Sequence, residues 1–374
     1  MTAEPELPDA LVPLPSQPED VPWPTEEWPR CSAADAGVDE ARLEALLDEL
    51  CDGEHPLMGR TFAAAVVVGG RLVAERYGMW PVRDLRALEP NPPLEPIEPS
   101  TRLLSWSMAK SITSLAVGVA VGDGAISLDD PVADPHWQAP GDPRSAITWD
   151  DLLTMRPGLA WTEEYYDLDG DVLPDVVTML FGDGAPDMAA FAADKELVNS
   201  PGSPEAYAYS SGTTNIVSAA LARTLGLDRD GMECFLRERV LEPIGVRDAD
   251  LRFDEAGTFI GSSYAYLTLL DWCRFGLLAI RGGVWDGRRV VPEGWIDHGR
   301  RARSPEEGDK FHGAHWWSWA LPDGRFAAHG FEGQRVVCHP TRDVVCVRLG
   351  KTGAEGAQPL TDHLAEIALL FPRL

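Results

Sequence analysis

The chain has 374 residues, 44% of them hydrophobic, and carries 60 acidic against 32 basic residues, which gives a formal net charge of −28. This length and apolar content suffice for a large buried core, in one large domain or two interleaved ones. The acidic balance argues against nucleic acid as a partner, because no basic stripe exists to neutralise phosphates, and an anionic membrane would repel the chain. No window approaches the roughly 18 apolar residues of a membrane span.

Residues 1–35 are dense in proline and acidic residues, and they predict an extended arm rather than a domain. They lack the basic start and the apolar run of a secretory signal, so we expect a cytoplasmic protein. The six cysteines lie far apart, without a C-x-x-C pair or a Cys/His cluster of zinc spacing. We interpret them as reduced packing residues and expect neither a metal nor a cofactor.

After the arm, apolar residues at helical spacing predict a helix over residues 39–50. Residues 61–78 predict a β-hairpin, since a β-branched run and a second alternating run flank Gly69 and Gly70. Between residues 146 and 284 apolar residues recur three and four apart, which indicates a mostly helical region.

Near the C-terminus, residues 324–350 predict two or three short strands, and residues 360–371 predict an amphipathic helix. Strands at both ends with few between favour one antiparallel sheet made from the two termini, an α/β (α+β) fold flanked by helices. We therefore expect an α/β lobe from residues 36–145 and 285–374, with residues 146–284 inserted as a helical lobe. The crevice between two such lobes is the expected binding site.

The sequence "LLSWSMAKSITSL" places Lys110 three residues after Ser107, in a chain with four lysines. Positions three apart share a helix face, so the hydroxyl and the amine can meet. A serine becomes a good nucleophile when a base takes its proton, and a buried lysine with a lowered pKa can be that base. The helix start would also offer free N–H groups to a developing oxyanion. The simpler alternative is a helix-capping serine and a surface lysine.

Two further motifs contain groups that such a hydrolase would use. In "YAYSSGTTNIV", Tyr209 precedes an apolar helix and could pass a proton between the serine and a leaving group, with Ser211 as a hydrogen-bonding partner. A buried core tyrosine is the alternative interpretation. In "AAHGFEGQ", glycines after a strand would let a backbone N–H approach a substrate carbonyl and complete an oxyanion hole.

The order S-x-x-K, Y-x-[NS] and H-G-F-x-G-Q, spread over nearly the whole chain after the arm, resembles the serine β-lactamase and penicillin-binding-protein superfamily. Within it the sequence is similar to class C-like hydrolases of the 6-aminohexanoate-dimer hydrolase type, which share the serine two residues after the tyrosine, "WTEEYYD" after "TMRPGL", and "DGRRVVPEGWI". The resemblance implies a β-lactamase-like fold with Ser107 as nucleophile, Lys110 as general base and Tyr209 as acid/base. It also implies an oxyanion hole from the N–H groups of Ser107 and Phe331, with Tyr165 at the pocket rim.

Two departures from this family concern the substrate. Penicillin-directed members carry K-T-G on the strand where this chain has Ala328-His329-Gly330, and the missing lysine would hold the β-lactam carboxylate. A literal K-T-G occurs at Lys351-Thr352-Gly353, but only helical sequence follows it, so we interpret it as a coincidence. Ser211 replaces asparagine, which weakens recognition of a β-lactam and matches the amidases.

Several neighbouring residues have two interpretations each. His329 and Gly330 could contact substrate, or the histidine could be hydrogen-bonded within the wall. Trp316 and Trp317 could line an apolar pocket for an acyl or alkyl chain, or they could pack in the core.

An acidic loop follows Trp161, and Glu332 adds a carboxylate near the proposed site. These carboxylates could favour an amine-bearing substrate, although a solvated loop is the simpler interpretation in so acidic a chain. The loop residues are Glu163, Glu164, Asp167 and Asp169.

We therefore expect a metal-free serine hydrolase that cleaves a small amide or ester through an acyl-enzyme. A β-lactamase or D-alanyl carboxypeptidase-like activity is the alternative within enzymes, although peptidoglycan lies outside the cytoplasm. A catalytically idle member that binds ligands through the same cleft is the alternative outside enzymes, and the three intact catalytic side chains count against it. The sequence leaves the acyl group, the leaving group and the oligomeric state open, and a homodimer is compatible with it.

Overall fold

The structure is a computed structural model, and it describes residues 10–81, 93–165, 172–306 and 308–374. Its α-helices are α1 (Glu40–Cys51), α2 (Ala109–Gly122), α3 (Trp149–Leu153), α4 (Asp175–Phe181), α5 (Met188–Ala193), α6 (Ser211–Leu225), α7 (Arg229–Leu236), α8 (Leu269–Ile280), α9 (Trp295–Arg300) and α10 (Ala357–Leu369). Its strands are β1 (Glu54–His55), β2 (Gly59–Val68), β3 (Arg71–Tyr77), β4 (Met79–Pro81), β5 (Leu94–Pro96), β6 (Leu103–Leu104), β7 (Asp250–Leu251), β8 (Ala265–Leu267), β9 (Val284–Trp285), β10 (Arg288–Arg289), β11 (Ser304–Pro305), β12 (Lys310–His312), β13 (Trp317–Trp319), β14 (Phe326–Gly330), β15 (Gln334–His339) and β16 (Val344–Lys351). The short 3-10 helices η1 (Trp106–Met108) and η7 (Phe331–Gly333) flank the region described below as the candidate site.

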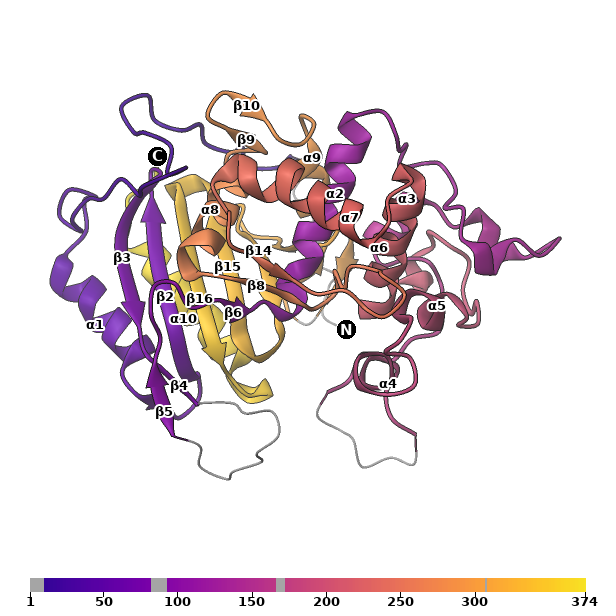
Figure 1. The fold of residues 1–374 in the computed structure, drawn as a ribbon. Helices are drawn as coiled ribbons and strands as arrows, with labels where there is room; N and C mark the ends of the chain where they lie inside the picture. Colours follow the sequence, from indigo (N-terminus) through magenta and orange to yellow (C-terminus); the bar gives the residue numbers. More distant parts are fainter. Residues whose placement is uncertain (1–9, 82–92, 166–171, 307) are drawn as a thin grey trace.

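Within the described residues, nine strands form one sheet in the order β1-β2-β16-β15-β14-β13-β12-β11, with β3 also paired to β2. The longest pairing joins β2 to β16, from Val68 opposite Val344 to Arg60 opposite Lys351, so the two ends of the chain lie side by side (Figure 1). These strands are rich in valine and alanine, which suits a sheet covered on both faces. The predicted hairpin, the C-terminal strands and the single sheet built from both termini are confirmed.

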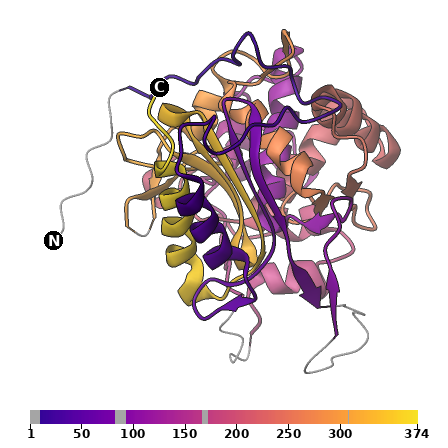
Figure 2. The same ribbon diagram turned by 90° about the vertical axis from the view of Figure 1, so that its left-hand side faces the viewer.

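Helices α1 and α10 pack side by side over one face of this sheet (Figure 2). Asp39 caps α1 by accepting the N–H of Arg42, and the leucines of its inner face are buried, as the helical spacing predicts. α10 buries Leu360, Leu364 and Ile367 against the same face.

Helix α8 covers the opposite face, where it packs against β2, β15 and β16. This helix lies inside the range expected for the helical lobe, yet it rests on the sheet. Gly276 permits the close approach, because a Cβ there would lie 2.5 Å from Cγ1 of Val345. The helix is also shorter than its apolar pattern indicates, since Ala265–Leu267 forms β8 and pairs with β6. Strand pairing here overrides a helical pattern, and it fixes the segment that leads into Ser107.

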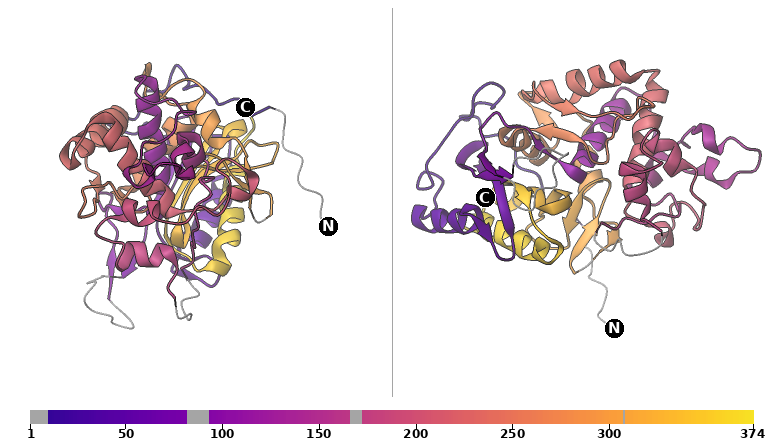
Figure 3. Two further views of the ribbon diagram at one scale, coloured as in Figure 1. Left: turned by 90° about the vertical axis from the view of Figure 1, so that its right-hand side faces the viewer. Right: turned by 60° about the horizontal axis from the view of Figure 1, so that its bottom comes forward.

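Helix α2 runs between the sheet and the helices α3, α5 and α6, and its residues Ala109–Ala120 are buried all round. Such a helix belongs to the interior rather than to a surface. The helices α3, α4, α5 and α6 gather on the side of α2 away from α1 and α10 (Figure 3). The start of α2 therefore lies where the end of β14 and the start of α6 come together, and this is where the catalytic motif lies.

The described part of the N-terminal arm, residues 10–35, is extended along the surface without helices. Three buried arginines attach it to the body through hydrogen bonds: Arg300 to the carbonyl of Val12, Arg281 to Oε1 of Gln17, and Arg274 to the carbonyl of Pro24. Among the helices that the structure describes, none has the length and apolar character needed to cross a bilayer.

Candidate active site

Ser107 lies on the 3-10 turn η1, which follows β6 and leads directly into α2. The preceding residue, Trp106, has a φ of 46°, a left-handed conformation that is costly for a bulky side chain. This turn leaves Ser107 half-buried, while the rest of the helix start is buried. Strain of this kind is common where a fold presents a functional group.

Lys110 is 2% exposed, and its ammonium group donates to three oxygen atoms. They are Oγ of Ser107 at 2.9 Å, Oγ of Ser211 at 2.9 Å and the backbone carbonyl of Ser262 at 3.0 Å. Burial lowers the pKa of Lys110 to about 8, and the charge of Glu163 opposes this shift. The predicted pairing of Ser107 with Lys110 is therefore present, and the capping-serine and surface-lysine alternative is wrong.

Ser211 occupies the first turn of α6, where backbone N–H groups have no partner within the helix. Ser210 caps this helix by accepting the N–H of Thr213. The N–H of Ser211 donates to Oε2 of Glu163 at 2.8 Å, and its hydroxyl donates to Oε1 of Glu163 at 2.5 Å. Ser211 thus connects Lys110 to a carboxylate that lies 48 residues earlier in the chain.

Glu163 is half-buried within this network, so the solvated-loop interpretation is wrong for this residue. It also accepts hydrogen bonds from Nε1 of Trp161 at 2.6 Å and from the hydroxyl of Tyr165 at 3.1 Å. Glu164 is exposed, and the predicted loop residues Asp167 and Asp169 lie outside the described residues. The sequence signal for Glu163 was its place between two aromatic residues in "WTEEY", which composition alone cannot separate from a solvated acid.

Tyr209 places its ring beside Lys110, with Nζ 5.0 Å from the ring centroid. Its ring also packs on Trp317 at 5.1 Å and against His312 at 5.6 Å between centroids. Burial and the charge of Glu163 raise the pKa of Tyr209, and a hydrogen bond with Ser107 opposes the rise. The phenol is therefore protonated at neutral pH and is placed to exchange a proton with the nucleophile.

The turn Phe331–Gly333 follows β14 and carries the predicted second N–H of an oxyanion hole. A Cβ at Gly330 would lie 2.2 Å from the carbonyl oxygen of Ser105, so glycine allows the end of β14 to approach the Ser107 segment. Gln334 holds the turn by donating to the carbonyl of Phe331 at 2.9 Å, and Glu332 adopts a φ of 56°. Gly330 thus acts through close backbone packing, while the roles of both N–H groups stay predictions.

Aromatic rings line both sides of this constellation. On one side Phe331 packs on Tyr165 at 4.5 Å and edge-on against Trp106 at 5.5 Å between centroids. On the other side Trp317 contacts Tyr209, whereas Trp316 is 1% exposed and stacks on Phe275 in the core. The core interpretation therefore fits Trp316, and Trp317 is also buried, so its predicted role as a pocket wall stays a prediction.

The histidines near the site are in their neutral form. His329 is half-buried and stacks on Trp317 at 6.0 Å, and burial lowers its pKa well below the usual value. Burial likewise lowers the pKa of His312 well below its usual value and that of His315 to about 3. His329 reaches Tyr209 through Trp317, so its predicted contact with substrate stays a prediction.

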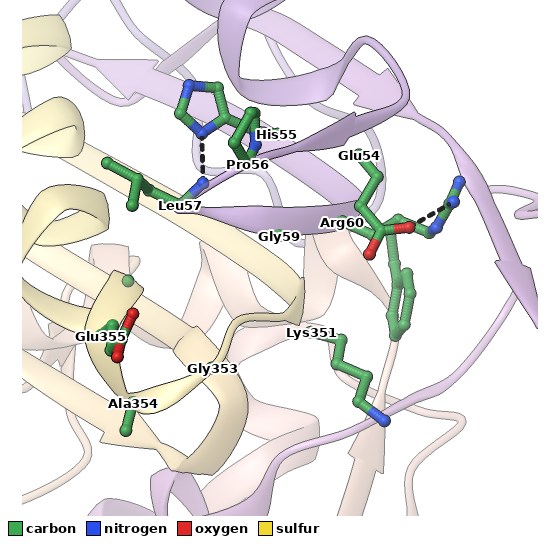
Figure 4. A pocket seen from close by; sticks show the side chains of 12 residues that line it. Glu54, His55, Pro56, Leu57, Gly59, Arg60, Lys351, Gly353, Ala354 and Glu355 are labelled. Atoms are coloured by element: carbon green, nitrogen blue, oxygen red, sulfur yellow. Dashed lines mark hydrogen bonds and ion pairs between the residues drawn. The ribbon is translucent and has the colours of Figure 1, made fainter.

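Lys351 of the literal K-T-G lies at the end of β16, two strands from β14, and α10 follows it as predicted. It lines a cavity of about 620 Å³ together with Arg60 and Glu54 (Figure 4), and Ser107 does not line this cavity. Nζ of Lys351 lies 3.5 Å from a carboxylate oxygen of Glu332. The motif therefore lacks the position on β14 that its sequence letters suggest.

A different lysine, Lys310, which belongs to none of the sequence motifs, lies on the aromatic wall. Nζ of Lys310 is 4.4 Å from the ring centroid of Trp317. On the neighbouring strand to His329, Arg335 donates to the carbonyl of Gly330 at 2.9 Å. Both cations contribute to the lowered pKa of His329. In the part of the chain that the structure describes, no group of three His, Cys, Asp or Glu side chains could hold a metal ion.

Comparisons with known proteins agree with this geometry. A model of the beta-lactamase family matches residues 54–369. A 6-aminohexanoate-dimer hydrolase from Paenarthrobacter ureafaciens is 25% identical over 325 residues, which cover 82% of this chain and 77% of that relative.

Solved structures share the fold at low identity. A structure assigned as a 6-aminohexanoate-dimer hydrolase from Bacillus anthracis has a TM-score of 0.69 and 18% identity, over 96% of this chain and 90% of that one. A penicillin-binding protein homologue from Caulobacter crescentus has a TM-score of 0.65 and 19% identity, over 89% of this chain and 98% of the other. EstCE1, a hydrolase with promiscuous acyltransferase activity, has a TM-score of 0.64 and 16% identity, over 88% and 97%. This chain belongs to the beta-lactamase family, and it is a serine hydrolase of the β-lactamase and penicillin-binding-protein superfamily.

Proposed function

We propose that this serine hydrolase cleaves a small amide or ester through an acyl-enzyme formed on Ser107. One observation carries the proposal: Nζ of Lys110 lies 2.9 Å from Oγ of Ser107, in surroundings that lower the pKa of the amine to about 8. A lysine with this pKa is partly neutral near pH 7 and can take the serine proton, which an ordinary surface lysine cannot.

The reaction follows from these positions. Oγ of Ser107 attacks the substrate carbonyl while Lys110 takes its proton, and the N–H groups of Ser107 and Phe331 stabilise the oxyanion. Tyr209 gives its proton to the leaving nitrogen or oxygen as that bond breaks, and the Lys110 ammonium restores the tyrosine proton. Water then attacks the acyl-ester, its proton passes back through the same groups, and the carboxylic acid leaves.

The surroundings of Ser107 favour linear substrates over β-lactams. The rings of Phe331, Tyr165 and Trp317 offer apolar surface for an alkyl chain. Lys351, the lysine of the K-T-G letters, lines a separate cavity. The names of the relatives support the same class, because one acts on an aminohexanoate dimer and another is a hydrolase with acyltransferase activity.

A labelling experiment followed by a substrate panel tests the proposal. A fluorophosphonate probe should add to Ser107, seen by intact mass and peptide mapping, and Ser107→Ala should abolish the adduct while leaving the fold intact. A label on another residue would refute the assignment. Values of kcat/KM for p-nitrophenyl butyrate and a linear aminohexanoate dimer should exceed that for nitrocefin, and a higher value for nitrocefin would return the chain to the lactamases.

The acid role of Tyr209 has its own test. Tyr209→Phe should lower turnover of amides by about 10²- to 10⁴-fold and turnover of p-nitrophenyl esters less, because p-nitrophenolate leaves without a proton. Equal losses on the two substrate types would place Tyr209 in positioning instead.

A further inference from the structure

The three oxygen atoms around Nζ of Lys110 differ in what they can donate. Ser262 offers a backbone carbonyl, which can only accept. Ser211 offers a hydroxyl, but it gives its proton to Glu163 at 2.5 Å, so toward Lys110 its oxygen can only accept. Ser107 also accepts from the ammonium group, at 2.9 Å, but no carboxylate in the described part of the chain takes its proton, so this hydroxyl is the one that can donate to the amine once the amine is neutral.

We propose that Glu163 is a positioning residue that acts through Ser211 to point the lone pair of neutral Lys110 at Ser107. A neutral amine has two N–H groups and one lone pair. When the N–H groups donate to Ser211 and Ser262, the lone pair faces Oγ of Ser107 and can accept its proton. A Ser211 free to turn its own proton toward the amine would occupy this lone pair, and Ser107 would then face a donor. A buried aspartate fixes the tautomer of a catalytic histidine by the same logic.

The carboxylate of Glu163 is held in a single orientation by four donors. Oε2 accepts Nε1 of Trp161 and the backbone N–H of Ser211, while Oε1 accepts the hydroxyls of Tyr165 and Ser211. The N–H of Ser211 belongs to the first turn of α6, so the negative charge also lies at the positive end of the helix dipole. The carboxylate of Glu163 is therefore a fixed part of the hydrogen-bond network of the site.

The charge of Glu163 has a second, separable effect on Lys110. Burial lowers the pKa of the amine and Glu163 raises it, so removal of the charge should lower that pKa further. The other titratable groups near the amine are Tyr209, whose pKa is raised, and His312 and His315, whose pKa values are lowered. These groups keep one charge state near pH 8, so the acid limb of the rate reports Lys110.

The experiment compares Glu163→Gln, Ser211→Ala and the double variant with the wild type, by kcat/KM for p-nitrophenyl butyrate and by the rate of fluorophosphonate labelling across pH. We expect each single variant to lose roughly ten- to a hundredfold at the alkaline plateau, the usual worth of a hydrogen bond to a charged group. The double variant should lose no more than the worse single variant, because the two residues act as one unit. Only Glu163→Gln should move the acid limb to lower pH, since Ser211→Ala keeps the charge.

Glu164→Gln is the matched control, because it removes the same charge from the next residue, whose side chain is exposed. It should keep both the plateau and the acid limb. The inference rests on the proposed function, and the two fail differently. If the probe does not label the wild type, both proposals are refuted. If the wild type is labelled, the role of Glu163 alone is refuted by any one of three results. These are additive losses in the double variant, an acid limb that does not move in Glu163→Gln, or full activity in Ser211→Ala.

Discussion

Two buried cations lie near the candidate site and have different roles: Lys110 contacts Ser107, and Arg348 contacts the turn that carries Phe331. Lys110 is 2% exposed and Arg348 is fully buried. Each is surrounded by uncharged oxygen atoms: Lys110 by the hydroxyls of Ser107 and Ser211 and the carbonyl of Ser262, Arg348 by a hydroxyl and four backbone carbonyls. Although the two side chains are similarly buried among similar atoms, Lys110 is the proposed base, whereas Arg348 holds segments of the fold together.

The guanidinium of Arg348 connects three segments of the sheet. It donates to the carbonyls of Glu332 and Gly333 in the turn that carries Phe331, and to those of Met58 and Arg60 at the start of β2. Its planar fork can satisfy many acceptors at once, and it keeps its charge when buried. Arg348 therefore fixes the turn on which the predicted oxyanion donor depends.

Burial lowers the pKa of both groups, but from different starting values. The pKa of Arg348 starts at about 12.5 and is lowered to about 9, so this residue stays charged at neutral pH, whereas the pKa of Lys110 is lowered to about 8 and Lys110 exists in part as the neutral amine. Burial therefore makes a cation into a base only where the group can lose its proton at the working pH.

The largest expected effect concerns Lys110. Lys110→Arg should lower kcat/KM as much as Lys110→Ala, by about 10²- to 10⁴-fold or more, because arginine cannot accept the proton of Ser107. Steady-state kinetics on p-nitrophenyl butyrate measure the loss, and the rate of fluorophosphonate labelling confirms that acylation is the affected step. Near-normal activity in the arginine variant would mean that the charge, and not the base, is what the site needs.

The next effect concerns stability. Arg348→Met should lower the free energy of unfolding by about 2–5 kcal/mol, because several buried carbonyls would lose their donors at about 1–3 kcal/mol for each unsatisfied group. Urea denaturation measures this loss. Arg301→Met, at an exposed arginine, is the control and should change stability by less than about 0.5 kcal/mol. An unchanged stability in the Arg348 variant would show that water or relaxation replaces the clasp.

The dependence of kcat/KM on pH should depend on Lys110 and not on Arg348. The neutral form of Lys110 is the active one, so kcat/KM should fall about tenfold per unit below a pKa of about 8 and reach a plateau above it. Folded Arg348→Met should keep this acid limb, because the guanidinium of Arg348 bonds the turn after β14 and the start of β2 rather than Ser107 or Lys110. A limb near pH 6 in the wild type would point to a histidine and contradict the assignment to Lys110.

The pairing of Ser107 with Lys110 was predicted from their spacing, whereas the links through Glu163 and Ser262 depend on distant contacts and were not predicted. Ser107 and Lys110 lie three apart on one helix, so their meeting is a local property. Glu163 meets Ser211 only because the fold brings a loop to the start of α6, and Ser262 contributes a carbonyl that has no side-chain signal. The fold shows the same limit.

The paired ends of the sheet were predicted from local patterns, since alternation and turn residues specify hairpins. The strand β8 lies within the region predicted as mostly helical, and its pairing with β6, far away in sequence, decides its conformation. The position of α8 on the sheet was missed for a related reason: apolar residues three and four apart predict a buried helix face without naming the surface that buries it.

The smallest effect concerns a third cation, Lys310, which is half-buried and lies over the ring of Trp317. Its charge is close enough to the wall of the site to attract a substrate carboxylate, but solvent screens it, so the attraction should be worth about 0.2–1 kcal/mol, or up to roughly fivefold. Lys310→Met should therefore lower kcat/KM for a linear amide that ends in a carboxylate by a few-fold and leave p-nitrophenyl butyrate unchanged. Lys195→Met is a matched control, because Lys195 lies 4.0 Å over the ring of Phe191 and pairs with Asp175. Equal losses on charged and neutral substrates would assign Lys310 to packing of the wall, and a loss on the scale of Lys110→Arg would make it part of the catalytic machinery.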